Sequence, residues 1–426
     1  MIPANLISKK RDGIILNKDE INSFFNGYVL GRVSDAEMSA MLMAIYFNGM
    51  NEDETFSLVD IMVHSGSVLN FDDSKNLIGD KHSTGGVGDK VSLILAPVMA
   101  SAGIKVPMIA GRSLAYTGGT IDKLESIPGF QSHTDLSTFK KWVTNNGYAI
   151  IAQSKEICPA DKLIYSLRSK TGTVPSVPLI CGSIMSKKIA EGISGLVLDI
   201  KIGNGAFMKT KKQANELGKW MTKIGTAFDI RTDVVYTNMN QPLGRFAGLS
   251  CEIAEAIDCL KGNGPDDLMA VTLELGSKLL IQSKIVKNKN DAIAIQNEII
   301  HSGNALQTFN ESVKSQGGVL ENFYSLNKPK YEKFIYPSKQ GTITRMDTES
   351  IGWILVEISK DKNKNSNHID YSAGIEFLKK IGDTVDPTEP MFRMFNSNEN
   401  LLDDWEKSLE ATTIIGKSSN KIDLIL

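Results

Sequence analysis

From about residue 77, short apolar segments alternate with segments of helical periodicity. The run NLIGDK is followed by VSLILAPVMASAG, VPMIAG, FKKWVTNNG and YAIIAQ. Such alternation is typical of a largely parallel sheet whose faces are covered by helices, because each helix returns the chain to the start of the next strand. This pattern constrains the fold more than any other feature of the chain, and it predicts an α/β lobe.

Helical patterns precede and interrupt this region. In residues 1–66, apolar residues recur at i, i+3 and i+4 spacing, and Asn17 and Ser34 each stand three residues before a glutamate, as in a capping box. A further helical stretch at about 161–193 lies inside the α/β region. We expect it to pack on the N-terminal helices, so that the chain crosses between two lobes more than once.

Beyond this stretch, GLVLDIKIG reads as a strand, helices and strands are expected to alternate to about residue 325, and residues 341–360 read as strands. The predicted fold class is α/β plus α: a small helical lobe, a larger mixed-sheet α/β lobe, and a C-terminal α+β domain. The predicted domains are 1–66 for the helical lobe, joined by about 161–193; 67–160 and 194–330 for the α/β lobe; and 331–426 for the C-terminal domain.

The charge balance excludes broad classes of function. The chain of 426 residues carries 47 Lys and Arg against 49 Asp and Glu, a formal net charge of −2. This balance gives no electrostatic footprint for nucleic acid or for an anionic membrane. No apolar run approaches the length of about 18 residues that a membrane-spanning helix needs. If the protein binds an anion, a local pocket must do so.

The cysteines predict a reducing compartment. Their spacing includes no CxxC, and the chain has no HExxH, so a zinc site is not expected. They are also too sparse for a disulfide scaffold, and the N-terminus lacks the pattern of a signal peptide. Reduced thiols in a cytoplasmic protein are therefore predicted for Cys158, Cys181, Cys251 and Cys259.

The strongest local signal is the segment DKHSTGGVGDK at 80–90, between a short strand and a helix. Its glycines let backbone N–H groups approach an anion, and the helix start adds favourable partial charge. Lys81 supplies a full positive charge, and Ser83 and Thr84 supply hydroxyl donors. The segment is neither a Walker A loop nor a dinucleotide fingerprint. The pattern favours phosphate binding over its alternative, a tight turn with exposed polar residues.

Two further segments have polar residues where a ligand would bind. YTGGT at 116–120 is a second glycine-rich helix start, and together the two favour one shared anion site. Capping of the helix by Thr120 is a complete structural alternative. Asp199 and Lys201 flank an isoleucine in a strand, where they either mark the edge of a cleft or form a structural ion pair.

A third group of side chains would suit a planar polar heterocycle with carbonyl oxygens. Ser183 and Lys187 share one face of a helix, and Arg168 offers a planar fork of donors near Tyr165. From the residues alone, a solvated helix face is the better interpretation of Lys187. Lys188 beside it is expected to face solvent.

These motifs together resemble the thymidine and pyrimidine-nucleoside phosphorylase family. The resemblance rests on DKHSTGGVGDK, GRSLAYTGGTIDKLESIPGF, PADKLIYSLRSKTGTVPSVPLICGSIMSKK and LDIKIGNGAFMK, in the same order and spacing over nearly the whole chain. It implies a helical lobe and an α/β lobe that flank a cleft, a C-terminal α+β domain, and a homodimer. It also implies inorganic phosphate as co-substrate and no required cofactor, while the charge balance and the short apolar runs predict neither nucleic acid nor membrane as partner.

The resemblance assigns roles residue by residue. His82, Arg168 and Lys187 would be catalytic, because they would stabilise or protonate the departing base. The implied phosphate ligands are Lys81, Ser83, Ser92 and Thr120, and the implied pyrimidine ligands are Tyr165, Arg168, Ser183 and Lys187.

Three departures from the family pattern lie near the second glycine-rich turn. Ala110 stands where the family has a phosphate-binding serine, Ser113 where it usually has glycine, and Tyr116 where it has histidine. We hypothesise that the Ser113 hydroxyl replaces the one missing at Ala110, which makes Ser113 a further candidate phosphate ligand. The alternative is that these changes are drift or mark a shifted substrate range.

A fourth departure concerns a monovalent cation. Some bacterial members of the family bind potassium through a threonine at position 90 and a segment near 243–255. Here position 90 is Lys90, whereas Gly88, Leu243 and Glu255 remain as candidate cation ligands. We hypothesise that the Lys90 ammonium occupies the cation position and makes activity independent of potassium.

The leading hypothesis is a pentosyltransferase that carries out reversible phosphorolysis of uridine, thymidine and deoxyuridine to free base and (deoxy)ribose 1-phosphate. One alternative is a catalytically altered nucleoside-binding paralogue, which Ala110 and Tyr116 motivate, and another is a phosphorylase with shifted sugar specificity. A third is phosphoribosyl transfer to an aromatic acceptor, for which no magnesium-binding acidic pair stands out.

Overall fold

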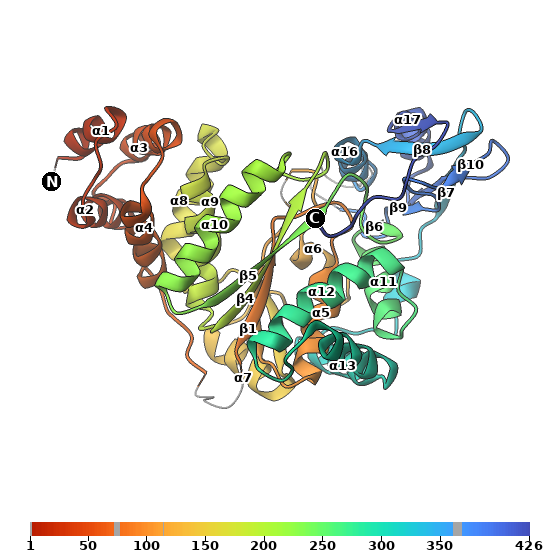
Figure 1. Cartoon of the computed structure of the whole chain (residues 1–426), viewed down its shortest axis with the longest axis horizontal. Helices are drawn as coiled ribbons and strands as arrows, with labels where there is room; N and C mark the ends of the chain where they lie inside the picture. Colours follow the sequence, from red (N-terminus) through yellow and green to blue (C-terminus); the bar gives the residue numbers. More distant parts are fainter. Residues whose placement is uncertain (1, 72–76, 114, 361–368) are drawn as a thin grey trace.

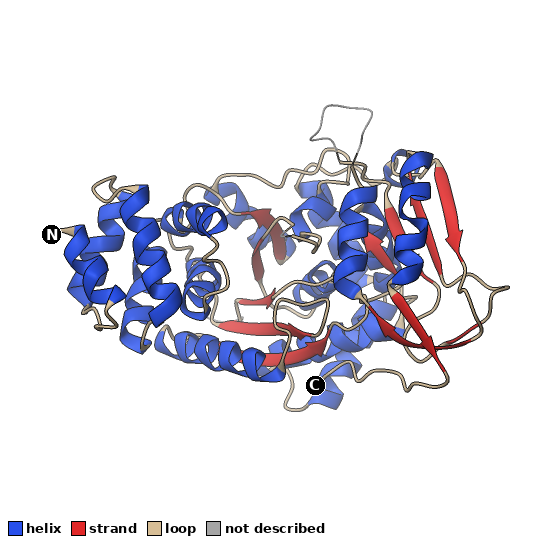
Figure 2. Ribbon diagram, turned by 90° about the horizontal axis from the view of Figure 1, so that it is seen from above, coloured by secondary structure: helices blue, strands red, loops and turns tan. Residues whose placement is uncertain are grey.

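The computed structural model describes residues 2–71, 77–113, 115–360 and 369–426. Three bodies follow one another along the longest axis (Figure 1): helices at the N-terminal end, a central sheet with helices around it, and a domain of strands and helices at the other end. Seen from above, the first body consists of helices alone, whereas the other two contain strands (Figure 2). The predicted fold class is therefore confirmed.

The helical lobe begins with four helices. The capping boxes predicted at Asn17 and Ser34 are both present, and Asn51 forms a third with Glu54. In each box two side chains bind backbone N–H groups that the first helical turn leaves without partners, so the sequence itself sets these helix starts. The helices are α1 (Pro3–Arg11), α2 (Lys18–Val29), α3 (Asp35–Asn48) and α4 (Glu52–His64).

Two helices from the middle of the chain complete this lobe. Ile164 and Leu179 are fully buried in the same apolar core as Phe24, Phe25 and Met62 of the N-terminal helices. Each buried side chain of this kind contributes on the order of 1.5–3 kcal/mol, so the shared core holds these helices together. They are α8 (Pro159–Thr171) and α9 (Val177–Ala190).

Three chain segments cross between the lobes side by side. The Ser67 N–H donates to the Glu156 carbonyl at 2.7 Å, and the Leu69 N–H donates to the Ala190 carbonyl at 2.8 Å. Gly192 has a φ of 71°, and a Cβ there would lie 2.1 Å from the Leu69 carbonyl oxygen. Only glycine allows this close approach.

The central sheet has the strand order β1-β4-β5, and its pairings are parallel. The strands β2 and β3 form a second parallel pair, which a bridge between Ile78 and Lys105 links to the first. A mixed sheet was predicted, but the only antiparallel contact of these described strands is the bridge from Ile425, near the C-terminus, to Thr237. The elements are β1 (Gly79–Ser83), α5 (Val91–Ser101), β2 (Val106–Ala110), α6 (Thr120–Leu124), α7 (Leu136–Asn146), β3 (Tyr148–Ala152), β4 (Gly195–Ile202), α10 (Lys211–Ala227) and β5 (Arg231–Asn238).

Helices follow one another from residue 250 to 326, where sequence analysis predicts alternating helices and strands. That prediction is wrong, because short apolar runs fit either element; in α12, Leu268, Val271 and Leu275 are buried at helical spacing. The strand before them, β6, pairs with β9 of the C-terminal domain and not with the central sheet. The elements are β6 (Phe246–Gly248), α11 (Ser250–Leu260), α12 (Asp266–Gln282), α13 (Lys289–His301), α14 (Asn304–Ser315) and α15 (Phe323–Leu326).

The C-terminal domain contains two antiparallel sheets, ordered β6-β9-β11-β7 and β10-β8-β12. The strands predicted over 341–360 are correct only for β8. A helix follows instead, because the Asp347 side chain caps its start by accepting from the Ser350 N–H. The elements are β7 (Tyr331–Ile335), β8 (Gly341–Met346), α16 (Thr348–Ile358), β9 (Gly374–Phe377), β10 (Thr384–Val385), β11 (Phe392–Asn396), α17 (Glu399–Ala411) and β12 (Thr413–Gly416).

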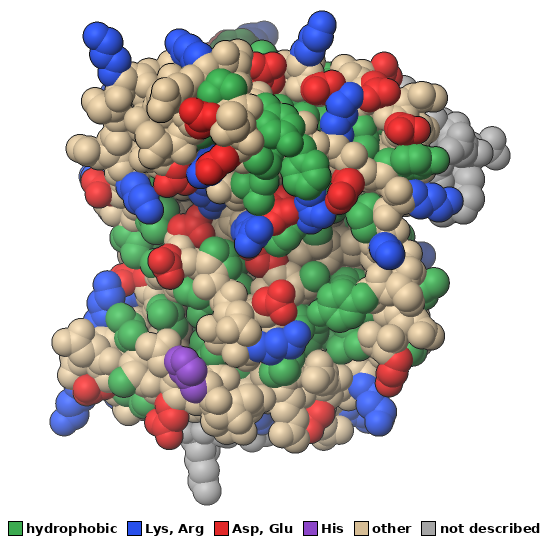
Figure 3. Space-filling view, turned by 90° about the vertical axis from the view of Figure 1, so that its right-hand side faces the viewer, with side chains coloured by type: hydrophobic (Ala, Val, Ile, Leu, Met, Phe, Trp, Pro, Cys, Tyr) green, Lys and Arg blue, Asp and Glu red, His purple; other side chains and the backbone are tan. Residues whose placement is uncertain are grey.

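The surface carries mixed charge. On the face that Figure 3 shows, which is the right-hand side of Figure 1, Lys and Arg side chains are interspersed with Asp, Glu and apolar side chains. That face has no field of one sign of the kind that nucleic-acid-binding surfaces carry. Within the described ranges, no helix is long and apolar enough to cross a membrane, and no cluster of His, Cys, Asp or Glu is arranged to hold a metal ion.

Candidate active site

The glycine-rich turn predicted to bind phosphate follows directly on β1. Lys81, His82 and Ser83 stand at the carboxyl end of this strand, which lies parallel to β4. Ligands bind at this edge of open α/β sheets. The turn requires left-handed backbone at Gly85 (φ 89°) and Gly88 (φ 76°), which glycine adopts without strain.

Asp89 organises the candidate phosphate ligands. Ser83 Oγ donates to Asp89 Oδ2 at 2.6 Å, and Lys81 Nζ lies 3.7 Å from Asp89 Oδ1. Lys81 Nζ also lies 3.5 Å from Ser92 Oγ, so three predicted phosphate ligands share one location. Although burial opposes it, the charges of Lys201 and Lys81 hold the pKa of Asp89 below its usual value. Sequence analysis gave Asp89 no role, although it lies inside the motif.

A buried ion pair lies behind this turn. Lys201 Nζ is 2.8 Å from Asp199 Oδ2, and both side chains are fully buried, so the structural interpretation of this pair is correct. Lys201 Nζ also lies 3.6 Å from Asp89. Burial lowers the pKa of Lys81, while Asp89 and Asp199 raise it. A bound phosphate would add negative charge beside Lys81 and favour its charged form further.

The second glycine-rich turn lies against the first. A Cβ at Gly85 would be 3.5 Å from Thr117 Oγ1, and Lys123 Nζ donates to a backbone carbonyl of the first turn at 2.7 Å. Gly119 is the N-cap of α6, and Thr120 is the first residue within the helix, so the capping interpretation of Thr120 is wrong. Within the described residues the Thr120 hydroxyl has no hydrogen-bond partner, which leaves it for a ligand.

Ser113 directs its hydrogen away from this site. Its Oγ and its N–H both donate to Asp122 Oδ2, the N–H at 2.6 Å. Asp122 also accepts from Arg112. Because a hydroxyl has a single hydrogen, Ser113 has none left for a phosphate in this arrangement. These contacts give no support to the hypothesis that Ser113 replaces the hydroxyl missing at Ala110.

Lys187 and Ser183 lie together on α9, with Lys187 Nζ 3.2 Å from Ser183 Oγ. Lys187 Nζ also lies 2.5 Å from Asp161 Oδ2 of α8, and its side chain is only 19% exposed, so it is not part of a solvated face. Asp161 is buried, and its Oδ1 has no described hydrogen-bond partner. Sequence analysis missed Asp161. Its place one helical turn before Tyr165 was the signal available.

Arg168 is buried, and its Nε is the one guanidinium nitrogen without a partner among the described atoms. Nη1 donates to the Leu179 carbonyl at 2.9 Å and Nη2 to the Val174 carbonyl at 2.7 Å. Burial lowers the pKa of Arg168 to about 10, and Asp161 opposes this shift. The Tyr165 ring centroid lies 5.7 Å from the guanidinium carbon. An unpaired buried donor costs about 1–3 kcal/mol, which a ligand carbonyl oxygen would recover.

Positive charges surround His82. Burial lowers the pKa of His82 well below its usual value, and Lys188, Lys187 and Lys81 lower it further, while Asp89 opposes them. The imidazole is therefore neutral near pH 7 and makes no hydrogen bond to a described residue. The candidate base ligand Lys187 and the candidate phosphate ligand Lys81 therefore both act on the pKa of this ring. A neutral imidazole donates a hydrogen bond but does not act as an imidazolium acid.

The Lys90 ammonium lies among the oxygens that the family resemblance assigns to a cation. Nζ donates to the carbonyl oxygens of Leu243 at 3.1 Å and Phe246 at 2.8 Å, and to Glu255 Oε2 at 2.5 Å. A Cβ at Gly88 would lie 2.3 Å from the Leu243 carbonyl oxygen, so the segments are tightly apposed. Although burial opposes it, Glu255 raises the pKa of Lys90. Since an ammonium already takes these oxygens, the residues do not fit a potassium ion as well.

Tyr116 joins the second turn to the C-terminal domain. Its ring centroid lies 5.9 Å from that of Phe207 and 6.0 Å from that of Trp353 in α16, and Lys209 Nζ lies 5.9 Å above the ring. A Cβ at Gly352 would come within 2.7 Å of the Tyr116 carbonyl oxygen. The tyrosine at this position therefore acts as a packing contact between the two domains.

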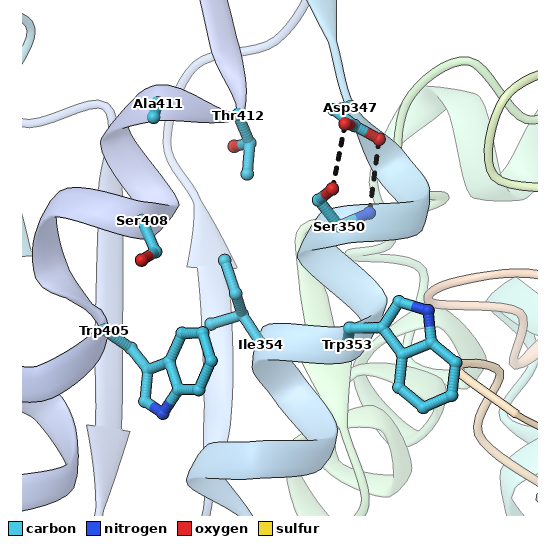
Figure 4. A pocket seen from close by; sticks show the side chains of 8 residues that line it. All are labelled: Asp347, Ser350, Trp353, Ile354, Trp405, Ser408, Ala411 and Thr412. Carbon is cyan, nitrogen blue, oxygen red and sulfur yellow. Dashed lines mark hydrogen bonds between the residues drawn. The ribbon is translucent and has the colours of Figure 1, made fainter.

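A hollow of about 380 Å³ lies in the C-terminal domain between α16 and α17 (Figure 4). It contains no residue that sequence analysis assigned to the site, so it is not part of the candidate active site. Its lining residues are Asp347, Ser350, Trp353, Ile354, Trp405, Ser408, Ala411 and Thr412.

The two-lobed fold and the family models that match it show a glycosyl-transferring enzyme of the pentosyltransferase class. Residues 4–66 match the model "Glycosyl transferase family, helical bundle domain", and residues 75–306 match "Glycosyl transferase family, a/b domain". Residues 342–416 match "Pyrimidine nucleoside phosphorylase C-terminal domain". The chain belongs to the pyrimidine-nucleoside phosphorylase family.

Comparison with individual proteins agrees with this assignment. The chain is 43% identical over 414 residues to pyrimidine-nucleoside phosphorylase from Staphylococcus aureus, in strain COL among others, covering 96% of this chain and 95% of the relative. Among solved structures, anthranilate phosphoribosyltransferase from Thermus thermophilus is similar with a TM-score of 0.59 and 16% identity, covering 73% of this chain and 99% of that one. The second likeness concerns the fold alone.

Proposed function

We propose that this chain catalyses the reversible phosphorolysis of pyrimidine nucleosides, namely uridine, thymidine and deoxyuridine, to free base and (deoxy)ribose 1-phosphate. The observation that carries the proposal is the contact between the elements that bear the two donor sets: Lys188 Nζ, beside Lys187, lies 2.5 Å from Asp80 Oδ2, beside Lys81. The set around Lys81 suits a phosphate, and the set around Lys187 suits the carbonyl oxygens of a pyrimidine.

The chemistry follows from these donors. Phosphate held by Lys81 and the backbone of the two turns attacks C1′ of the sugar, while the Ser83 hydrogen is donated to Asp89. A phosphate oxygen forms a bond to C1′ while the bond from C1′ to N1 breaks, and its electron pair passes to the base. Negative charge then develops on O2 and N1, where Arg168 and Lys187 stabilise it. Losing one such donor commonly costs about 10²–10³ in rate.

His82 acts in this scheme as a neutral donor. Its N–H would bind a carbonyl oxygen of the base as charge develops there, without transferring its proton. The base leaves as an anion and takes its proton from solvent afterwards. Burial and the charges of Lys188, Lys187 and Lys81 lower the pKa of His82. They therefore keep the imidazole in this neutral form.

The test is a release assay. The protein is mixed with a panel of uridine, thymidine, deoxyuridine, cytidine, purine nucleosides and 2′-modified uridines, with and without inorganic phosphate, and free base is followed by chromatography. We expect phosphate-dependent release from the unmodified pyrimidine nucleosides and loss of release in Lys187→Met. No base from any pyrimidine nucleoside would overturn the proposal.

Ala110 favours a second candidate, a catalytically altered nucleoside-binding paralogue. Ala110 ends β2 and offers no hydroxyl, and the Ser113 hydroxyl is bound to Asp122. Calorimetric binding of nucleoside without base release would support this candidate. Release only from 2′-modified uridines would instead indicate a shifted sugar specificity.

We also propose that the enzyme needs no added cofactor and is independent of potassium. The contacts of Lys90 with Leu243, Phe246 and Glu255 support this, because they supply a tethered positive charge where a cation would otherwise be bound. Initial rates of dialysed protein in potassium, sodium and Tris salts of equal ionic strength test the proposal. Strong activation by potassium would contradict it.

We further propose a homodimer formed through the helical lobe. Met43, Tyr46 and Phe47 of α3 are exposed, Phe47 by 76%, as is Leu163 of α8, which packs on α3. Neighbouring exposed apolar side chains of this kind mark interaction surfaces. Light scattering is expected to give twice the mass of the 46.6 kDa chain, and Phe47→Asp is expected to shift it towards that of one chain. A single-chain mass for the parent would refute the dimer.

The cysteines support a cytoplasmic location. Cys158, Cys181, Cys251 and Cys259 are all free thiols, as expected in a reducing compartment. We propose that the enzyme acts in the cytoplasm, and fractionation of cells that express it tests this directly.

A further inference from the structure

A buried group of three ionisable side chains lies between α9, β1 and β2. Lys188 Nζ donates to Asp80 Oδ2 at 2.5 Å, to Glu191 Oε1 at 2.7 Å and to the Ile109 carbonyl oxygen at 3.2 Å. The Ile109 N–H donates to Glu191 Oε1 at 3.0 Å. The Lys188 side chain is 2% exposed and the two acidic side chains 0%, so the prediction that Lys188 faces solvent is wrong.

These contacts connect the two halves of the proposed site. Asp80 immediately precedes Lys81 on β1, which carries the proposed phosphate ligands. Lys188 immediately follows Lys187 on α9, which carries the proposed base ligands. Ile109 is the second-last residue of β2, whose end borders the second glycine-rich turn. The Lys188 ammonium of α9 therefore contacts both β1 and β2, and these three elements carry the residues of the proposed site.

We propose that Lys188, Asp80 and Glu191 form a positioning unit that fixes the helix carrying the base ligands relative to the strand carrying the phosphate ligands. The inference rests on the proposed function and extends it to residues that bind neither substrate. A displacement at C1′ requires the attacking oxygen and the leaving nitrogen to be held in line. A misplacement of about 1 Å can lower the rate by about 10²-fold.

The charges of the unit balance when Glu191 holds a proton. Burial raises the pKa of Glu191 well above its usual value, and Asp80 adds to this shift while Lys188 opposes it. Glu191 Oε2 and Asp80 Oδ1 are buried acceptors without a partner in the described part of the chain. A proton on Glu191 that is donated to Asp80 satisfies both oxygens. The unit then consists of one cation, one anion and one neutral acid.

The variants that test the unit are Lys188→Met, Asp80→Asn, Glu191→Gln and the double variant Lys188→Met/Asp80→Asn. We expect each of the first two to lower kcat by about 10–100-fold, because α9 and β1 lose their common anchor. Glu191→Gln is expected to cost least, because glutamine resembles the protonated acid. The affinities for phosphate alone and for uracil alone, measured by calorimetry, are expected to change by less than about threefold, because neither ligand touches the unit.

Two variants distinguish a positioning role from a merely structural one. The double variant leaves no unpaired buried charge, so we expect its melting temperature to recover towards that of the parent while kcat stays low. Lys10→Met is the matched control, because Lys10 is paired with Glu54 at 2.8 Å in the helical lobe and is equally buried. It is expected to lower the melting temperature without lowering the kcat of the folded protein.

The outcomes distinguish the inference from the proposed function. If the parent releases no base, the proposed function fails and the inference falls with it. If the parent is active and the double variant recovers both stability and kcat, the unit is structural only and the inference is wrong. Turnover by Lys188→Met and Asp80→Asn equal to that of the parent would overturn it as well.

Discussion

Asp161 Oδ2 lies 2.5 Å from Lys187 Nζ, and this contact joins α8 to α9 within the proposed base-binding face. The same carboxylate raises the pKa of Arg168, in opposition to burial. Asp161 itself is buried, with Oδ1 unpartnered among the described residues. One acidic side chain therefore contacts Lys187 and acts on the charge of Arg168, the two cations that we propose as ligands of the base.

Replacing Asp161 by Asn is expected to lower kcat/KM for pyrimidine nucleosides by about 10–100-fold, because a hydrogen bond between charged groups contributes about 1.5–3 kcal/mol. Steady-state kinetics at saturating phosphate measure the effect. Asp12→Asn is the control, because Asp12 is exposed and pairs only with Arg11 at the surface. Equal kinetics for the two variants would contradict the role given to Asp161.

Local patterns predicted the parts of the molecule that local chemistry decides. The alternation from residue 77 gave β1, α5, β2, α7 and β3 in the right order, and the capping boxes gave the starts of α2 and α3. A strand was predicted where α16 forms, because its Ile, Trp and Val residues favour strands. The helix is stabilised instead by the cap from Asp347 and by the burial of Ile351 and Ile354.

Such local patterns could not identify the partners of the buried charges. Lys188 and Asp80 are 108 positions apart, and Lys90 and Glu255 are 165 apart. A lysine in the sequence shows a charge but neither its burial nor the distant carboxylate that compensates it. The resemblance located Lys187 and Lys90, but the roles of Asp161 and Lys188 follow only from packing.

Replacing Lys90 by Thr is expected to make activity depend on potassium. Without the ammonium, Glu255 and the carbonyl oxygens of Leu243 and Phe246 have no cation, and breaking a buried pair in this way costs about 3–5 kcal/mol of stability. Potassium is expected to restore part of the melting temperature and of the rate in this variant. In the parent, neither potassium nor sodium is expected to change them. A Lys90→Thr protein equally active in sodium and potassium would refute the replacement.

The pH dependence of stability is expected to report on His82. Its pKa in the folded protein is well below the unfolded value of about 6.5, because of burial and the charges of Lys188, Lys187 and Lys81. As the pH falls below about 6.5, the unfolded chain takes up this proton first, so the free energy of unfolding decreases.

His82→Asn is therefore expected to flatten this decrease, whereas the exposed control His301→Asn is not. Denaturant unfolding at a series of pH values measures the slope. The imidazole signal of His82 in nuclear magnetic resonance is expected to stay in its neutral position from about pH 8 to pH 6. A titration midpoint near the usual value would show that the surrounding lysines do not act on the ring.

Position 110 rather than position 113 is expected to control phosphate affinity. Ala110→Ser adds a donor at the end of β2, and a hydrogen bond to a charged group of about 1.5–3 kcal/mol corresponds to a decrease of about tenfold or more in the phosphate KM. Ser113→Gly is expected to change this KM by less than about twofold, and to lower stability by about 1 kcal/mol, because its hydroxyl hydrogen is donated to Asp122. Phosphate saturation curves for the two variants measure both effects. If Ser113→Gly raised the phosphate KM as strongly as Ala110→Ser lowers it, the Ser113 hydroxyl would have to turn from Asp122 to the phosphate on binding, and it would then replace the missing serine after all.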